Sequence, residues 1–308
     1  MGADQADARD RDPREVDTRA VRRAFGRAAA TYDVAAVLQR EVGTRMGARL
    51  DVVKLAPHAV LDAGCGTGDA LGALALRYPD ARMVALDLAL PMVQAAQARV
   101  ASGRSLLRRI MPWRAAESAT APRFVCGDVN AMPFGGAAFD LVWSNLALQW
   151  VNDLPHTFGE LHRVLKIDGL LTFTTFGPDT LREIRTAFAA VDGHTHTNRF
   201  ADMHDIGDML VHAGFADPVI DMETITLTYG DARSLLRELK QIGATNATQG
   251  RPRGLLGKAR LQRVLASLEA TARDGRIPAT FEVVYGHAWK AQATHTPDGL
   301  PIVRFGRR

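Results

Sequence analysis

The chain has 308 residues, of which 47% are hydrophobic and 23% are charged, and its formal net charge is +4. This composition is ordinary for a globular protein and excludes a mostly disordered chain. No stretch approaches the roughly 18 uncharged apolar residues that a membrane span requires. The polar start, MGADQADARDRDPREVDTRAVRRAF, also lacks the apolar core of a secretory signal. We therefore expect a cytoplasmic protein that does not enter a membrane.

Cysteine content and charge indicate the redox compartment and the kind of partner to expect. Cys65 and Cys126 are too few for a disulfide framework, which fits a reducing compartment. The sequence pI is about 9.3, a mild basic excess that would favour an acidic partner. Because the chain has neither a long Lys/Arg block nor a recognisable nucleic-acid motif, we expect no nucleic-acid partner.

The chain order of apolar segments predicts an α/β fold. Strand-length apolar runs alternate with helix-length amphipathic segments, which is typical of a parallel sheet covered by helices. The predicted strands are 59–64, 82–88, 123–128, 139–145, 170–176, 219–229 and 281–289. The last two alternate apolar with polar residues, so we expect them to pair antiparallel at one edge. The sequence thus predicts a seven-stranded, mostly parallel, doubly wound sheet.

The segments outside the predicted strands are expected to form tails, helices and a cap. Residues 1–18 are expected to form a disordered tail, 19–292 a single domain, and 293–308 a C-terminal tail. Apolar spacing over 21–50 predicts a pair of short helices against the sheet. Helical patterns at 231–242 and 257–273 predict a helical cap, at about 230–280, inserted before the last strand. The basic segment 101–122 is expected to be a surface loop or a short helix.

A glycine-rich turn, VLDAGCGTGDALGAL, follows the first predicted strand. Gly64, Gly66 and Gly68 would allow a sharp turn and a close approach of a ligand to the main chain. A dinucleotide fingerprint, however, requires a third glycine at position 69, which is Asp69. A carboxylate there would repel a pyrophosphate and would favour a cationic ligand without phosphate.

S-Adenosylmethionine meets that description, because it carries a sulfonium and an ammonium group. Asp62 and Asp69 flank the turn and are candidate partners for the positive charge. Asp87 ends the second strand 23 positions after Gly64, an offset that suits hydrogen bonds to ribose hydroxyls. Asp128 would accept from the adenine amine, and Met92 would pack on the base.

Four motifs in order carry a resemblance to class I S-adenosylmethionine-dependent methyltransferases. They are VLDAGCGTGDA, ALDLALPMV, VCGDVNAMPF and FDLVWSNLALQW, within about residues 55–180. The resemblance implies that S-adenosylmethionine is the cofactor. It also implies cofactor contacts at Val129 and Ser144, beside Asp62, Asp87, Met92, Asp128 and the three glycines.

Further segments resemble the malonyl-acyl carrier protein O-methyltransferases of biotin synthesis. They include FGRAAATYD, SNLALQWVNDLP, TFGPDTLREIR and ATFEVVYGHAWK, so the resemblance extends over about residues 20–290. That family esterifies the free carboxylate of a malonyl thioester, giving the malonyl methyl ester that primes pimeloyl synthesis. The resemblance implies malonyl-acyl carrier protein, or malonyl-coenzyme A, as partner. It implies a gating role for Tyr32 and acceptor contacts at Asn145, Gln149 and Trp150.

Carboxylate methylation requires no catalytic base, because a malonyl carboxyl group is already an anion at neutral pH. The site must instead desolvate this weak nucleophile and align it, so we expect a grip and a lid. Arg182 and Arg185 lie three apart on one predicted helix face and are the candidate grip. Arg251 and Arg253 are alternative contacts for an acidic carrier protein.

Three alternatives remain open from the sequence. His194, His196 and His204 would suit a metal only weakly, since no matching carboxylate or cysteine spacing accompanies them, and no metal is expected. A methyltransferase acting on a quinone precursor would need a more apolar acceptor cavity, with the arginine pair idle. An accessory protein of the same fold would bind the cofactor without turnover.

Overall fold

A computed structural model describes residues 12, 15–110, 121–191, 198–244, 246–251, 254 and 257–292, with the backbone alone for 104–110. Of the tails predicted at 1–18 and 293–308, residues 12 and 15–18 are described, and the others lie outside these ranges. Near the first described residues, Val16 is buried and forms a β-bridge with Thr248. Of the part of the chain that is described, no helix is both long and apolar enough to cross a bilayer.

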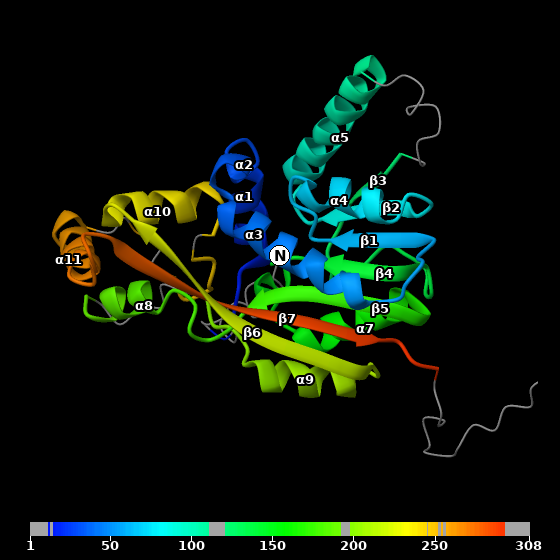
Figure 1. The fold of residues 1–308 in the computed structure, drawn as a ribbon. Coiled ribbons are helices and arrows are strands. Elements are labelled where there is room, and N and C mark those ends of the chain that lie inside the picture. The colour runs from blue at the N-terminus through cyan, green and yellow to red at the C-terminus, as the bar shows by residue number, and fades with distance from the viewer. Residues whose placement is uncertain are drawn as a thin grey trace, which may run out of the picture.

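Seven strands form one sheet in the order β3-β2-β1-β4-β5-β7-β6 (Figure 1). They are β1 (Ala59–Ala63), β2 (Arg82–Asp87), β3 (Arg123–Cys126), β4 (Phe139–Ser144), β5 (Leu165–Phe176), β6 (Ala216–Tyr229) and β7 (Ile277–Trp289). Strands β1 to β5 pair in parallel with one another, and β7 is antiparallel to both β5 and β6. This confirms the predicted mostly parallel sheet with an antiparallel edge.

The strand order creates a crevice at the middle of the sheet. From β1 the chain first builds outward through β2 to β3, and then returns to place β4 on the other side of β1. The loops leaving β1 and β4 therefore diverge, and ligands of such sheets bind at this point, beyond the carboxyl ends of the strands.

The helices occupy both faces of the sheet. They are α1 (Thr18–Ala28), α2 (Tyr32–Ala35), α3 (Val37–Arg49), α4 (Asp69–Arg77), α5 (Leu90–Ile110), α7 (Leu154–Val164), α8 (Arg182–Ala189), α9 (Met203–His212), α10 (Ala232–Gln241) and α11 (Lys258–Glu269), with short 3-10 turns at η1 (Leu50–Val52) and η2 (Leu148–Trp150). The predicted N-terminal helix pair is thus three helices. The first part of segment 101–122 continues α5, while residues 111–120 lie outside the described ranges.

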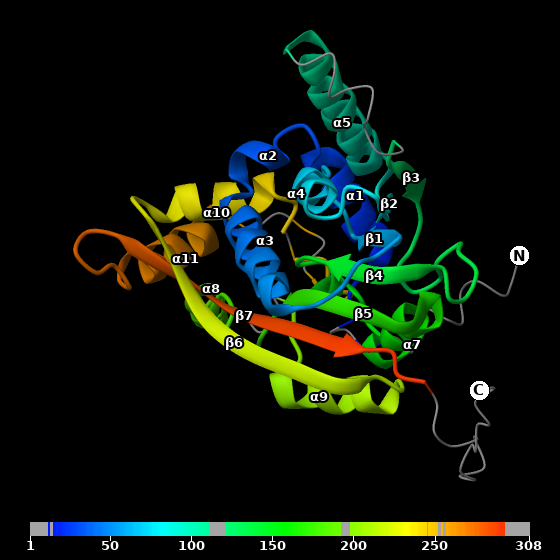
Figure 2. The same cartoon turned by 45° about the vertical axis from the view of Figure 1, so that its right-hand side comes forward.

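Alternate residues of the buried strands pack against opposite helix layers. In β1, Val60 joins the cluster that includes Val42 of α3, whereas Leu61 joins the cluster that includes Phe158 of α7. This period of two is the geometry of a strand buried on both faces. In Figure 2, α3 lies on one side of the sheet and α7 and α9 lie on the other.

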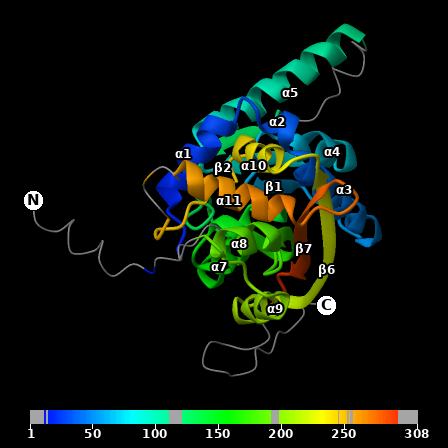
Figure 3. The same cartoon turned by 90° about the vertical axis from the view of Figure 1, so that its left-hand side faces the viewer.

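The predicted cap is present as α10 and α11, placed between β6 and β7 in the sequence. Figure 3 shows both helices on the same side of the molecule as α1. The two segments touch, because the Thr31 hydroxyl donates to the Gln241 carbonyl at 3.2 Å. The cap and the N-terminal helices therefore enclose the crevice jointly.

Candidate active site

The turn after β1 is held in a left-handed conformation that favours glycine. Gly64, Gly66 and Gly68 have φ angles of +84°, +53° and +77°. The N–H of Gly64 donates to the Leu86 carbonyl at 2.8 Å, which ties the turn to β2. A Cβ on Gly64 would lie 2.3 Å from the Cβ of Ala147, so the loop after β4 could not approach if a side chain were present.

Asp87 organises the same turn from the end of β2. Its carboxylate accepts hydrogen bonds from the backbone N–H of Gly66 at 2.9 Å and of Ala89 at 2.8 Å. Burial raises the pKa of Asp87, and these two hydrogen bonds oppose that shift. A carboxylate has further lone pairs, so Asp87 retains acceptor capacity toward a ligand.

A first cavity, called here the Asp87 cavity, lies over the ends of β1, β2 and β4. Its wall includes the glycine turn, the two loops after β2 and β3, and one face of η2. The lining residues are Thr18, Val21, Phe25, Tyr32, Gly64, Gly66, Leu86, Asp87, Leu88, Gly127, Asp128, Val129, Asn130, Asn145, Leu146, Ala147, Trp150 and Val151. Two acceptor groups, Asp87 and Asp128, together with the apolar Leu88 and Val129 suit a nucleoside.

A second cavity, called the Asp62 cavity, opens on the other side of the glycine turn. It shares Tyr32, Gly64, Gly66 and Asn145 with the Asp87 cavity, and Asp62 and Arg40 also line it. The Asp62 side chain is 3% exposed, and its Oδ2 has no partner. Burial, followed by the charges of Asp87 and Asp69, raises the pKa of Asp62 to about 8.

A buried carboxyl group without a partner is costly, and it indicates that a ligand completes the site. Arg40, on α3, donates to the Asp33 carbonyl at 2.5 Å, and no described carboxylate forms a salt bridge with it. An acidic and a basic group on one cavity fit the ammonium and carboxylate of an amino acid. The two joined cavities therefore fit a nucleoside linked to an amino acid, as in S-adenosylmethionine.

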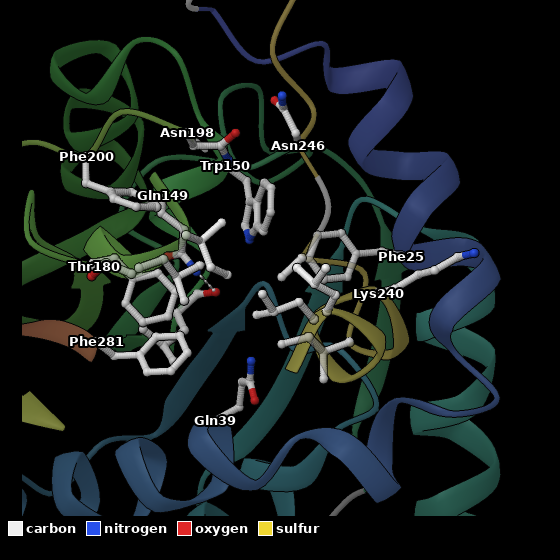
Figure 4. Close-up of a pocket in the computed structure, with 18 of the residues that line it drawn as sticks. Phe25, Gln39, Gln149, Trp150, Thr180, Asn198, Phe200, Lys240, Asn246 and Phe281 are labelled. Atoms are coloured by element: carbon white, nitrogen blue, oxygen red, sulfur yellow. Dashed lines mark hydrogen bonds between the residues drawn. The ribbon is translucent and has the colours of Figure 1, made fainter. Parts of the chain in front are cut away.

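A third cavity, called the cap cavity, adjoins the Asp87 cavity and has a volume of about 320 Å³. It is enclosed by α1, α8, α10 and η2 (Figure 4). Phe25, Tyr32, Leu146 and Trp150 line both cavities and so form their common wall. The other lining residues are Gln39, Gln149, Phe176, Thr180, Leu181, Ile184, Phe188, Asn198, Phe200, Leu236, Leu239, Lys240, Ile242, Ala244, Asn246 and Phe281.

Most of the cap cavity is apolar, and its polar groups are mainly amides. Figure 4 shows the indole nitrogen of Trp150 and the side-chain amide of Gln39 turned toward the interior. Gln149 donates to the Leu146 carbonyl at 2.7 Å, and its own Oε1 is buried without a partner. Among the described residues that line this cavity, none is Asp, Glu, His or Cys, and the sole basic one is Lys240.

Tyr32 lines all three cavities and so lies where they meet, and its gating role stays a prediction. Burial, together with the charges of Asp87, Asp33 and Asp69, raises the pKa of its phenol. The phenol therefore stays neutral at physiological pH. Asp33, the next residue, is linked to Arg99 of α5 and to the Thr67 hydroxyl at 2.6 Å, which fixes α2 over the glycine turn.

The structure brings most of the predicted residues together. Asp62, Gly64, Gly66, Asp87, Asp128, Val129 and Asn145 line the first two cavities, and Gln149 and Trp150 line the cap cavity. Gly68 does not line them, although its left-handed φ shapes the turn.

Two predicted cofactor contacts lie away from the cavities. Met92 is fully buried in a cluster with Ala28 and Ala89, so it packs beneath α1, and Leu88 takes the place expected for it. Ser144 is also fully buried, and its hydroxyl donates to the Ala63 carbonyl at 2.8 Å. Ser144 therefore joins β4 to β1.

The predicted arginine grip also lies elsewhere. Arg182 is about half exposed and faces Asp179 at 3.5 Å. Arg185 donates to the carbonyls of Pro178 at 2.8 Å and Thr180 at 3.2 Å. Neither lines the cap cavity. Arg251 is bound to Asp17 at 2.9 Å, and Arg253 lies outside the described residues.

Several lining residues were not predicted from the sequence. Arg40 could have been found, since it lies on the cofactor side of the helix that follows Tyr32. The turn at Leu146 could not be read from the sequence, because it depends on contacts with β5. The Leu146 N–H donates to the Thr174 hydroxyl at 2.9 Å, and this hydroxyl donates to Asn145 at 2.8 Å. Phe25 and Leu236 had none, because α1 and α10 meet only in the folded chain.

The histidines give no metal site within the described ranges. No group of three or more His, Cys, Asp or Glu side chains there could hold a metal ion. His204 contacts Asp202 at 2.8 Å, while His194 and His196 lie outside the described residues.

Comparison with known proteins agrees with this geometry. A family described as "Methyltransferase domain" matches residues 61–173. The malonyl-[acyl-carrier protein] O-methyltransferase of Gallionella capsiferriformans is 53% identical over 94% of this chain and 96% of its own. That of Nitrosospira multiformis is 54% identical over 89% of this chain and 90% of its own. Among solved structures, the YcgJ protein of Bacillus subtilis has a TM-score of 0.55 at 16% identity, covering 80% of this chain and 98% of its own, which shows a shared fold.

Proposed function

Because the chain belongs to the malonyl-[acyl-carrier protein] O-methyltransferase family, we propose that it methylates the free carboxylate of a malonyl thioester on acyl carrier protein. The methyl donor is S-adenosylmethionine. The product is the malonyl methyl ester which, by the resemblance noted above, primes biotin synthesis. We further propose that the reaction takes place in the cytoplasm.

We infer the cofactor contacts from the residues that line the two joined cavities. Asp87 and Asp128 would hold the ribose and the adenine, and Asp62 and Arg40 the amino acid end. When bound, S-adenosylmethionine supplies an electrophilic methyl group on a sulfonium. Burial raises the pKa of Asp62 and of Asp87 in the ligand-free protein, and the positive charge of a bound cofactor would favour their ionised, negatively charged forms around the glycine turn.

The observation that carries the proposal is the absence of a general base among the described residues of the cap cavity. A hydroxyl or phenol acceptor must lose its proton to react, which an enzyme usually arranges with His, Asp or Glu. Tyr32 is held neutral, since the pKa of its phenol is raised. A carboxylate acceptor needs no such group, because it is ionised at neutral pH.

The lining of the cap cavity also supports desolvation as the source of reactivity. Uncharged N–H groups of Trp150 and Gln39 would orient a carboxylate without forming a salt bridge. A bidentate arginine would instead stabilise the anion in its ground state and reduce its nucleophilicity. Arg182 and Arg185 lie outside this cavity, which agrees with a mechanism that relies on desolvation of the carboxylate rather than on an arginine contact.

A ring-carbon acceptor such as a quinone precursor is the alternative. The apolar lining of the cap cavity and the idle arginine pair are the features expected for it. The missing general base and the curated relatives weigh against it.

Labelled methyl transfer decides between these acceptors. The purified chain is incubated with S-[methyl-³H]adenosylmethionine and either malonyl-carrier protein or a quinone precursor. We expect label on malonyl-carrier protein that mild base releases as volatile methanol, as a methyl ester requires. Acetyl-carrier protein, which lacks the free carboxylate, is the matched control. Label on the quinone precursor alone would refute the proposal, and no label on either despite cofactor binding would indicate an accessory protein.

A further inference from the structure

The basic charge of the chain is concentrated on three helices. The wholly described helices α1, α10 and α11 carry ten Lys or Arg residues and two Glu residues. The whole chain has 38 basic and 34 acidic residues, so the remainder has 28 basic against 32 acidic. The positive net charge therefore comes from these helices, and without them the chain would be negative.

The exposed cations of these three helices are called here the basic face. They are Arg19, Arg22, Arg23, Arg27, Arg233, Arg237, Lys240, Lys258, Arg260 and Arg263, and all are exposed. No described carboxylate forms a salt bridge with any of them. One of the two acids, Glu238, accepts a hydrogen bond from the Tyr229 hydroxyl at 2.8 Å, so it is engaged within the fold. In the view of Figure 3, α1, α10 and α11 lie toward the same side of the molecule, and α10 packs against α11.

The basic face adjoins the cap cavity. Lys240 belongs to both, and Phe25 of α1 lines the cavity from the same side. The end of α1 and the residues after α10 are in close contact, since a Cβ on Gly243 would lie 3.2 Å from the Phe25 ring. A partner docked on the basic face would therefore stand beside the site at which an acceptor is methylated.

A second route to the cap cavity has the opposite charge. An open groove beside α8, called the Asp202 groove, shares Gln149, Phe188, Asn198 and Phe200 with the cap cavity. Its charged lining residues are Asp12, Glu15, Asp179, Asp202 and Asp205 against Arg185 and Arg199. An acidic protein would be repelled there and attracted to the basic face.

We propose that the basic face is the docking surface for the acidic carrier protein that delivers the acyl thioester, and that the acyl arm enters the cap cavity past Lys240, which is exposed and also lines the cavity. This inference rests on the proposed function, because it assumes a protein-borne acceptor. Carrier proteins have strongly acidic surfaces, so the charges are complementary. Such complementarity chiefly raises the association rate and makes it salt-dependent.

Charge reversal tests the docking surface separately from the chemistry. The variant carries Arg27→Glu and Arg237→Glu, and neither residue lines a cavity. We expect KM for malonyl-carrier protein to rise at least about tenfold, with kcat little changed. Malonyl-pantetheine, which has no protein surface and no phosphate, should be turned over as by the parent. Arg199→Glu, the same charge change on the Asp202 groove, is the matched control and should leave both acceptors unaffected.

Each other outcome overturns the inference. An unchanged KM for malonyl-carrier protein would show that the basic face is not used, and an equal loss with malonyl-pantetheine would show a defect in folding or chemistry. A larger effect of Arg199→Glu would move docking to the groove. If the reversal leaves KM unchanged but abolishes binding to phosphatidylserine vesicles or duplex DNA, the face serves a membrane or nucleic acid. Failure of the parent on both acceptors would refute the proposed function instead.

Discussion

The carboxylate of Asp87 at the end of β2 accepts a hydrogen bond from the backbone N–H of Gly66, at 2.9 Å, in the turn after β1. Two adjacent strand ends are thereby joined through a group that also lines the Asp87 cavity. Asp87 consequently has two roles: it fixes the glycine turn and it presents acceptor atoms to a ribose.

Replacing Asp87 should weaken nucleoside binding. In Asp87→Ala the loss of each hydrogen bond to the carboxylate should cost about 1.5 to 3 kcal/mol of binding free energy. Calorimetry with S-adenosylhomocysteine and with 5′-methylthioadenosine checks this, and both ligands should be affected because both contain the ribose. Equal affinity in variant and parent would contradict the assignment of Asp87.

Replacing Arg40 should have a different signature. Arg40 lines the Asp62 cavity and not the Asp87 cavity, so it should contact the amino acid end of the cofactor alone. In Arg40→Met we expect S-adenosylhomocysteine to bind more weakly by about 1.5 to 3 kcal/mol. The affinity for 5′-methylthioadenosine, which lacks the amino acid, should not change. Arg82→Met, an exposed site on β2, is the control. Parallel losses for both ligands would refute the contact.

The raised pKa of Asp62 predicts how the stability of the ligand-free protein depends on pH. The pKa is about 8 in the folded chain against an ordinary value of 3.8, so between these values the folded state binds more protons than the unfolded state. The free energy of unfolding should therefore fall as pH rises through this window. Asp62→Asn should reduce that slope, leaving the part due to Asp87, whose pKa is also raised. Urea unfolding at several pH values measures both slopes, and identical slopes would contradict the assignment.

The carboxylates of the site were predictable because they end neighbouring parallel strands. Such strands bring their carboxyl ends to one edge, so Asp62, Asp87 and Asp128 had to converge once the sheet was predicted. The helix face that Met92 occupies was less certain, because periodicity gives the spacing of a face but not its partner. Met92 packs beneath α1 rather than on the cavity.

The residues around the acceptor were less predictable, because periodicity gives the spacing of a helix face but not what that face contacts. Arg182 and Arg185 do lie on α8, but Arg185 turns to the carbonyls of Pro178 and Thr180. The cap cavity forms where α1, α8 and α10 meet, and these segments are far apart in the sequence. Only the tertiary fold reveals that contact.

The glycine turn gives the last prediction, through two substitutions with opposite effects. Gly64→Ala places a Cβ 2.3 Å from that of Ala147 at a φ of +84°, so either the turn or the loop after β4 must shift. We expect a loss of about 1 to 3 kcal/mol in stability and a much weaker affinity for S-adenosylhomocysteine. Gly72→Ala lies within α4, where an added Cβ meets nothing within 4 Å. It should stabilise the protein by about 0.5 to 1 kcal/mol and leave ligand binding unchanged. Urea unfolding and calorimetry on both variants measure these effects, and a neutral Gly64→Ala would show that the turn does not require a bare backbone.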